Sequence, residues 1–355
     1  MSANPPAATP PVNAAFAEQA AKVGIRTGRV LGLLVAAVAL VAVICVSLAV
    51  GARNIPVSDV VSVFFSSANQ IDSETIWSLR LPRTLLGVMA GIAFALSGAL
   101  MQALTRNPLA DPGILGINAG AAFAMVVAIG LLGITHPLSL IWFAFAGTGL
   151  AAISVYLAAM GGRAGATPLR LTLAGVAIGS ILRGLTSTLI FLDPNTFDHM
   201  LNWEVGSLAI TGYDNLIVTA PFVVIGIVLA LVSAPVLNVV ALGDDQARSL
   251  GAGIGRARMM VVIAVMLLTG AATAAAGPLG FIGLMVPYAA RWIGGTDQRW
   301  IFAYTLLLAP IVLLSADILG RLSMRPAEIQ VGIVTAFVGA PVLIWLVRSR
   351  KVSAL

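Results

Sequence analysis

The side chains that could carry out chemistry are few and lie far apart in the sequence. Cys45 is the only cysteine, so no disulfide can form within the chain. The two histidines, His136 and His199, form no ligand cluster, which argues against a metal centre. Neither of the two lysines, Lys22 and Lys351, belongs to a glycine-rich loop that cradles ATP phosphates. We therefore expect no bound metal, no cofactor and no enzymatic activity, and any uphill work must be driven by a partner or an ion gradient.

Charged residues inside apolar runs are the remaining candidates. Asp317 and Arg321 are one helical turn apart, and we predict that they pair with each other. Arg183 lies near the middle of an apolar run, with no acid three or four residues away. It either finds a partner on another helix or in a water-filled crevice, or it faces a central pathway where it attracts an anionic substrate.

The composition of the 355-residue chain defines the elements that must position these residues. Hydrophobic residues make up 59% and charged residues 10%, with a mean hydropathy of +1.01. A soluble protein carries roughly 25% charged residues, so these charges are too few to cover a globular surface. The apolar runs are continuous rather than alternating, which excludes a β-barrel. The sequence therefore predicts an all-α polytopic membrane protein.

The length of the apolar runs predicts ten transmembrane helices, because a bilayer core needs about 20 apolar residues per helix. Residues 1–25 are rich in Ala and Pro and are predicted to be a disordered cytoplasmic tail. Residues 26–355 are predicted to form one transmembrane domain. Its spans are expected at 30–51, 82–104, 114–133, 137–160, 169–192, 215–241, 257–276, 279–296, 300–320 and 327–347.

The distribution of positive charge predicts the orientation of this bundle, because cytoplasmic loops carry an excess of Lys and Arg. Ten spans place both termini on the same side. With cytoplasmic termini, fourteen of the twenty Lys and Arg residues lie inside, five lie outside and Arg183 lies within a span. We therefore predict cytoplasmic termini. The net charge of +6 reflects this topology, and no basic patch interleaved with aromatic residues indicates nucleic-acid binding.

Strings rich in Pro and Gly interrupt the apolar runs and carry the most specific signal. Residues 102–116 read QALTRNPLADPGILG, where Asn and Asp can cap freed backbone groups. Further strings are LTLAGV (171–176), LGDDQARSLG (242–251), GPLGFIGLMVP (277–287), EIQVG (328–332) and GAP (339–341). With these strings in this order, the chain from about residue 30 onward resembles the FecCD-type permease subunits of bacterial ABC importers for iron-siderophores, haem and cobalamin. The resemblance implies the type II ABC importer permease fold.

The predicted cytoplasmic loop at residues 241–256 takes its expected role from this resemblance. Judged alone, it holds two helical turns bracketed by glycines, and it is either a solvated connector or a short helix that enters a groove of a partner. It resembles the family's coupling helix, which is seated on a separate ATPase subunit that binds ATP and Mg. The implied coupling residues are Leu242, Gly243, Ala247, Arg248, Leu250 and Gly251.

The arginines on the predicted outer side have two interpretations. Snorkelling toward lipid headgroups is sufficient to explain Arg80 and Arg83 if they are judged alone. The resemblance implies that Arg80, Arg83 and Arg321 dock a periplasmic or lipid-anchored substrate-binding protein through its glutamates. Such charge pairs set the orientation and the rate of docking more than its affinity.

The resemblance also implies a gate at the cytoplasmic end, formed by Asn107, Leu109 and Thr167. This chain has Pro168 and Leu169 where small hydroxyl residues are common in the family, so the pattern departs there. The fifth span lines the family's translocation pathway, which favours a pathway position for Arg183.

The expected function is that of a permease in the bacterial inner membrane, paired with a second copy or a paralogue and transporting a ferric siderophore. Residues 203–208 read WEVGSL, similar to many siderophore members, although Trp203 is equally explained as an interfacial anchor. A haem or cobalamin permease of the same family is the alternative.

A secondary transporter driven by an ion gradient is the rival from a different class. It would need acids within the membrane to carry the coupling ion, and only Asp317 qualifies, near the end of a span and with a predicted partner. A membrane enzyme is less favoured still, because the sequence shows no paired acids and no nucleophile with a base.

Overall fold

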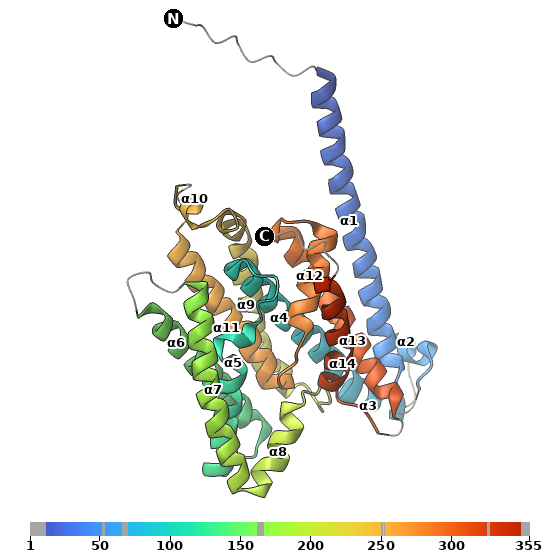
Figure 1. Ribbon diagram of the computed structural model, residues 1–355. Coiled ribbons are helices and arrows are strands. Elements are labelled where there is room, and N and C mark those ends of the chain that lie inside the picture. Colours follow the sequence, from blue (N-terminus) through green and yellow to red (C-terminus); the bar gives the residue numbers. More distant parts are fainter. Residues whose placement is uncertain are drawn as a thin grey trace, which may run out of the picture.

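The computed structural model describes residues 12–51, 54–65, 70–161, 167–249, 251, 253–324 and 327–348, and the regular elements within them are all helices. They form one bundle (Figure 1). The elements are α1 (Val12–Ala49), α2 (Val57–Phe65), α3 (Gln70–Thr75), η1 (Ile76–Arg80), α4 (Leu81–Thr105), η2 (Pro112–Leu115), α5 (Ile117–Val126), η3 (Val127–Leu131), α6 (Pro137–Met160), α7 (Pro168–Leu192), α8 (Pro194–Glu204), α9 (Asp214–Val240), α10 (Asp244–Ser249), α11 (Ile254–Ala276), α12 (Ile282–Gly294), α13 (Gln298–Ser323) and α14 (Val331–Arg348).

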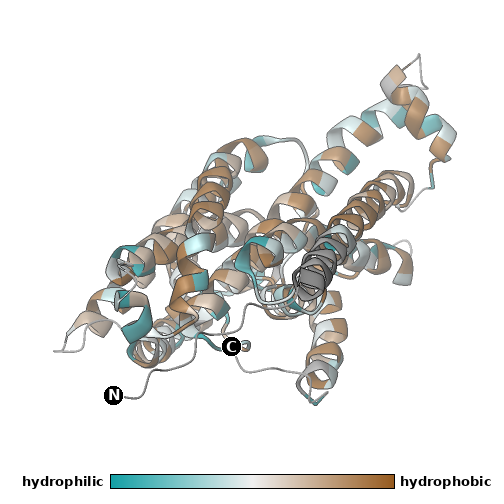
Figure 2. Cartoon of the chain, turned by 90° about the horizontal axis from the view of Figure 1, so that it is seen from above, coloured by the Kyte–Doolittle hydropathy of each residue, from teal (hydrophilic) through white to brown (hydrophobic). Residues whose placement is uncertain are grey.

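A helix occupies each of the ten predicted spans. Among the described residues, seven helices are long and apolar enough to cross a membrane, and two shorter apolar ones cover 117–131 and 331–345. The eighth predicted span is the most reduced, because α12 has only 13 residues and begins after Phe281, whose φ is +68°. Hydrophobic residues predominate along the helices, whereas hydrophilic ones gather mainly at helix ends and loops (Figure 2).

The bundle has two ends, named here by the short helix that each carries. The α10 end holds α10, the start of α1 and the finish of α4, and the α8 end holds α2, α3 and α8 (Figure 1). The helical backbone of α1 begins at Val12 and so differs from the disorder predicted for residues 1–25, of which 1–11 lie outside the described residues. Its Ala, Glu, Gln and Lys residues are strong helix formers, which explains the extension.

Three helices form the centre of the bundle and two lie at its margin. The central ones are α4, α11 and α13, whose apolar windows are 83%, 72% and 61% buried. The marginal ones are α1 and α7, with 11% and 17% buried. The marginal helices therefore leave most of their surface to lipid or to another subunit.

Small residues allow the central helices to approach closely. Gly98 of α4 crosses Gly283 of α12 so tightly that a β-carbon on Gly98 would lie 1.9 Å from the Gly283 carbonyl oxygen. Gly91, two turns earlier in α4, packs in the same way on the backbone of α13 at Ala309. Water does not drive helices together inside a membrane, so such backbone approach supplies packing energy that longer side chains would prevent.

We predict that Gly98→Ala destabilises the bundle by about 1–3 kcal/mol, the usual cost of overfilling a packed site. Thermal unfolding of the detergent-purified chain would measure it as a lower midpoint. Gly149→Ala in α6 is the matched control, because its new methyl would meet only the Met266 side-chain terminus at 3.8 Å. Equal midpoints for both variants would contradict this account of the packing.

Candidate functional site

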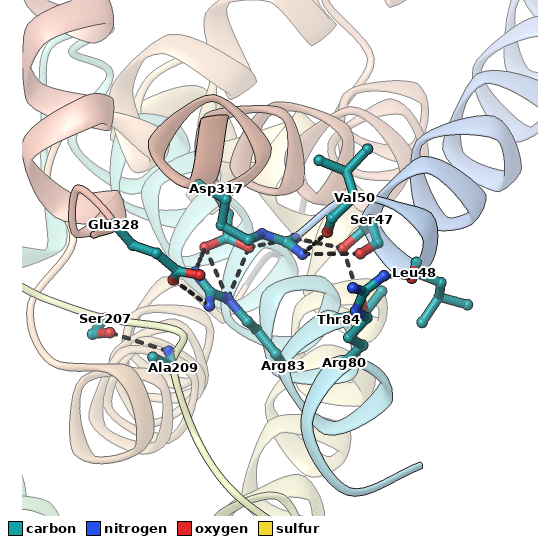
Figure 3. A network of polar contacts seen from close by, with 11 residues as sticks. Ser47, Leu48, Val50, Arg80, Arg83, Thr84, Ser207, Ala209, Asp317 and Glu328 are labelled. Atoms are coloured by element: carbon teal, nitrogen blue, oxygen red, sulfur yellow. Dashed lines mark hydrogen bonds and ion pairs between the residues drawn. The ribbon is translucent and has the colours of Figure 1, made fainter. Parts of the chain in front are cut away.

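One carboxylate, that of Asp317, holds two arginines at the α8 end. Asp317 is buried in α13, with its Oδ1 2.7 Å from Arg83 Nη2 of α4 and its Oδ2 2.7 Å from Arg321 Nη2 one turn along α13. Arg83 also reaches Glu328 before α14, with Nη1 2.6 Å from Oε2 (Figure 3). The predicted pair of Asp317 and Arg321 is thus confirmed, and it belongs to a four-residue ion cluster that joins α4, α13 and the start of α14.

The end of α1 is held by two arginines, Arg80 and Arg321. Arg80 Nη1 donates to two carbonyl oxygens within 47–50, at 2.6 and 2.8 Å, and Arg321 Nη1 donates to two others, at 2.9 and 2.8 Å. Arg321 Nη2 also donates to Ser47 Oγ, which bonds Thr84 Oγ1 of α4. The last carbonyls of a helix lack partners within it and carry its negative dipole end, so guanidinium groups are well suited to cap them.

These contacts define how accessible the predicted docking arginines are. Arg80 and Arg321 are only 6% and 2% exposed, and their guanidinium groups bind the end of α1. Arg83 is more open, with 14% of its side chain exposed, and its second partner, Glu328, has 32% of its side chain exposed. A cavity of about 370 Å³ is lined by the three arginines together with Asp72 and Glu328. Docking stays a prediction, and Arg83 is the arginine best placed for it.

The predicted gate loop after α4, residues 106–116, is rich in turns. Arg106 ends α4 in the left-handed conformation, with φ of +53°. Asn107 Oδ1 accepts the Leu109 N–H at 3.0 Å and leaves the Leu109 side chain exposed. Asp111 Oδ1 accepts the Gly113 N–H at 2.7 Å and so caps η2. Burial raises the pKa of the Asp111 carboxyl above its ordinary value, and the Gly113 hydrogen bond opposes this shift.

The other predicted gate residue, Thr167, is the N-cap of α7. Its Oγ1 accepts the Arg170 N–H at 3.4 Å, and Pro168 follows at the first helical position, where a missing N–H costs nothing. The departure from the family pattern at Pro168 is therefore compatible with a normal helix start.

The predicted coupling segment forms a short helix at the α10 end. Gly243 precedes α10 with φ of +109°, a conformation that favours glycine, and its carbonyl accepts the Ala247 N–H. Ala247 is fully buried, whereas Leu242 is 56% exposed. Arg248 is exposed and pairs loosely with Asp245, at 3.6 Å. Two further predicted positions close the segment: Gly251 has φ of +76°, and Leu250 lies outside the described residues.

The coupling segment and the gate loop are neighbours in space. A β-carbon built on Gly243 would lie 3.8 Å from Arg106 Nη1. The gate loop in turn packs on α7, because a β-carbon on Gly116 would lie 3.8 Å from the Gly175 carbonyl oxygen and 3.9 Å from the Gly179 nitrogen. The structure therefore brings together the predicted coupling and gate segments.

Arg183 lies on the exposed side of α7, and its Nη2 is 3.5 Å from the β-carbon position of Gly179. Ser180, Gly184 and Ser187 are exposed on the same helix, three or four residues apart. Residues at this spacing share one face, so α7 carries a polar stripe at mid-span.

The string at residues 203–208 has a packing role. The Ser207 N–H donates to the Ala276 carbonyl at 2.8 Å, and the Gly332 N–H donates to the Gly206 carbonyl at 3.3 Å. A β-carbon on Gly332 would lie 1.8 Å from the Val205 carbonyl oxygen. These backbone contacts join the end of α11 to the start of α14, and they account for the small residues of the string without reference to a substrate.

Residues 38–349, most of the bundle just described, match the FecCD transport family. The chain belongs to this family. It is 45% identical over 304 residues to the ferric enterobactin transport system permease protein FepD of Escherichia coli, covering 86% of this chain and 91% of FepD. It is 34% identical to the hemin transport system permease protein HmuU of Yersinia pestis, covering 87% and 94%.

A solved structure supports the same assignment. The inward-facing conformation of a metal-chelate type ABC transporter superimposes with a TM-score of 0.80 at 26% identity, covering 89% of this chain and 98% of that chain. This FecCD protein is therefore an ABC importer permease with the type II fold, and its helices identify it as a membrane-spanning transport subunit.

We predict that Asp317→Asn lowers the thermal midpoint of the purified FecCD protein strongly, because two guanidinium groups lose their shared charge. Removing one partner of a buried pair costs about 3–5 kcal/mol. Asp245→Asn is the matched control, since Asp245 is fully exposed beside Arg248 and exposed pairs contribute little. A midpoint for Asp317→Asn equal to that of the control would show that the cluster does not stabilise the fold.

Proposed function

We propose that this chain is the permease of an ATP-driven importer that moves a ferric siderophore across the bacterial inner membrane. The observation that carries the proposal is the short helix α10, which contains the exposed Arg248 and follows the exposed Leu242. The sequence of this chain has no ATP-binding loop of its own. Ala247 forms the buried side of α10, and Gly251 follows the helix. A short helix with one buried and one exposed side suits insertion into a groove of an ATPase subunit.

The position of α10 beside the gate loop supports a mechanism. The ATPase subunits bind ATP and Mg, and their closure displaces α10. Because Arg106 of the gate loop lies against Gly243, movement of α10 is passed to the loop that carries Asn107 and Leu109. That loop packs on α7, so the gate and the polar stripe respond together.

The two ends of the bundle have opposite partners in this proposal. The α10 end faces the cytoplasm with both termini, in keeping with the excess of positive charge predicted there. The α8 end faces a substrate-binding protein. A glutamate of that protein would replace Glu328 at Arg83, while Asp317 keeps the guanidinium in place. Such an exchange of one carboxylate for another costs little desolvation and favours correct orientation.

The polar stripe of α7 supports a second permease subunit, either another copy or a paralogue. A guanidinium at mid-span is costly against lipid, so Arg183 needs water or protein beside it. Two subunits that meet with their α7 helices facing a shared pathway would provide this environment. Arg183 would then attract an anionic chelate into the pathway.

The substrate assignment is supported by relatives. FepD is named for ferric enterobactin, and the YfmD permease of Bacillus subtilis, 38% identical, is named for Fe(3+)-citrate. The alternatives also have relatives, HmuU for hemin and a Yersinia enterocolitica BtuC, 39% identical, for vitamin B12. The higher identity to FepD favours a siderophore.

Reconstitution tests the proposal as a whole. The chain would be co-expressed with its candidate ATPase, purified and placed in proteoliposomes with the binding protein. We expect copurification of the ATPase, and ATP hydrolysis that rises with a ferric siderophore on the binding protein more than with haem or cobalamin. Accumulation of substrate by the chain alone, driven by a proton or sodium gradient, would contradict the proposal and favour a secondary transporter.

Arg183→Met tests the pathway assignment. We expect uptake of an anionic ferric chelate to fall by about tenfold or more, the scale of electrostatic focusing in charged clefts. Arg183→Lys is the control that keeps the charge, and it should retain most of the uptake. Unchanged uptake in Arg183→Met, at equal amounts of protein in the membrane, would remove Arg183 from the pathway.

A further inference from the structure

A polar side chain joins α9 to α13 beside the coupling segment. Asn238 lies in the last turn of α9, six residues before α10. Its Nδ2 donates to Asp297 Oδ1 at 2.8 Å, and its Oδ1 accepts the Gln298 N–H at 2.8 Å. Asp297 Oδ1 also accepts the Arg299 N–H at 3.0 Å, as the N-cap of α13. Both functional groups of the Asn238 amide are therefore used to hold the first turn of α13.

This contact lies at one end of a helix whose other end holds the ion cluster. α13 runs for 26 residues, which corresponds to about 39 Å at 1.5 Å per residue. It begins at the Asn238 contact and carries Asp317 and Arg321 in its last two turns. One helix thus contacts the end of α9, just before the coupling segment, at the α10 end and Arg83 at the α8 end.

Only a short stretch of chain separates Asn238 from the coupling helix. Three of the intervening residues, Ala241, Leu242 and Gly243, bond back to the end of α9. The base of α10 is therefore hydrogen-bonded to α9, and α9 is hydrogen-bonded to α13. A continuous series of hydrogen bonds therefore connects the start of α10 to α13.

We propose that Asn238 is a positioning residue that ties the coupling segment to α13, so that α10 and the ion cluster around Asp317 move as coupled parts. The inference rests on the proposed function and adds a route between its two faces. In this proposal, α13 transmits the docking of the binding protein at the α8 end to the ATPase at the α10 end. It transmits the closure of the ATPase in the opposite direction.

A charge swap tests this proposal in the complete importer. Asn238→Asp places a carboxylate against Asp297 and replaces a hydrogen bond by repulsion. Adding Asp297→Asn removes the repulsion, since the new amide can turn its Nδ2 toward the carboxylate introduced on α9, and Asn is also a good N-cap for α13. Ser233→Ala is the matched control, because Ser233 Oγ is buried in the same helix and bonds only the Ala230 carbonyl of α9.

The measurement is ATP hydrolysis in proteoliposomes, with and without the loaded binding protein. We expect the ratio of stimulated to basal hydrolysis to fall by about fivefold or more in Asn238→Asp, the low end of typical coupling between sites. Basal hydrolysis and ATPase copurification should remain, and the double variant and the control should show the normal ratio. A normal ratio in Asn238→Asp, an equal fall in basal and stimulated hydrolysis, or a double variant that does not recover would overturn the proposal.

A second variant covers failure of the carboxylate pair to fold. Asn238→Ala removes both bonds and adds no charge, and its ratio should fall while its basal hydrolysis remains; an unchanged ratio would overturn the proposal. The wild-type complex separates this test from that of the function. If the wild-type ATPase neither copurifies nor responds to the binding protein, the proposed function fails. If it responds and the variants respond equally well, only the role of Asn238 fails.

Discussion

The arrangement of the α8 end depends on one buried carboxylate. Asp317 pairs with both Arg83 and Arg321, and these two arginines with Arg80 connect α4, α13, α1 and the start of α14. Without that charge, two guanidinium groups would be buried with insufficient compensation, and breaking a buried pair costs about 3–5 kcal/mol. Within the cluster, Arg321 is buried and Arg83 keeps 14% of its side chain exposed. Arg83 thus has one buried partner, Asp317, and one more exposed partner, Glu328.

The sequence predicted the helices far better than their contacts. Continuous apolar runs are a local property, so ten helices appear at the ten predicted places, and the i, i+4 pair of Asp317 and Arg321 could be predicted from spacing alone. Arg83 is 234 residues from Asp317, and nothing in the local pattern links them. The sequence does not distinguish a helix at residues 12–25 from a tail, because Ala favours helices while the Pro and polar residues around it are typical of disordered segments.

In the candidate sites, too, local turns could be predicted from the sequence, whereas contacts between distant segments could not. The segments around Asn107 and Gly243 could be identified from their glycines and prolines, because turns require particular residue types. Their proximity, seen in Arg106 against Gly243, is a tertiary fact. Asn238 was overlooked, since a lone amide in an apolar helix gives no indication of its partner. Asp297, just before a predicted span, is a typical helix cap and could be identified from the sequence. The sequence does not show that Asn238 bonds to this cap.

Within one subunit, a series of contacts connects the coupling segment, the gate loop and α7. Gly243 lies against Arg106, the loop after Arg106 packs on α7, and α7 carries the polar stripe with Arg183. The contact of the gate loop with α7 brings backbone against backbone at Gly116, whereas Gly243 meets the guanidinium end of Arg106. Gly243 and Gly251 have positive φ, so the chain turns at both ends of α10 in conformations that other residues adopt only with strain. These glycines therefore favour a short helix beside the gate loop over a long connector.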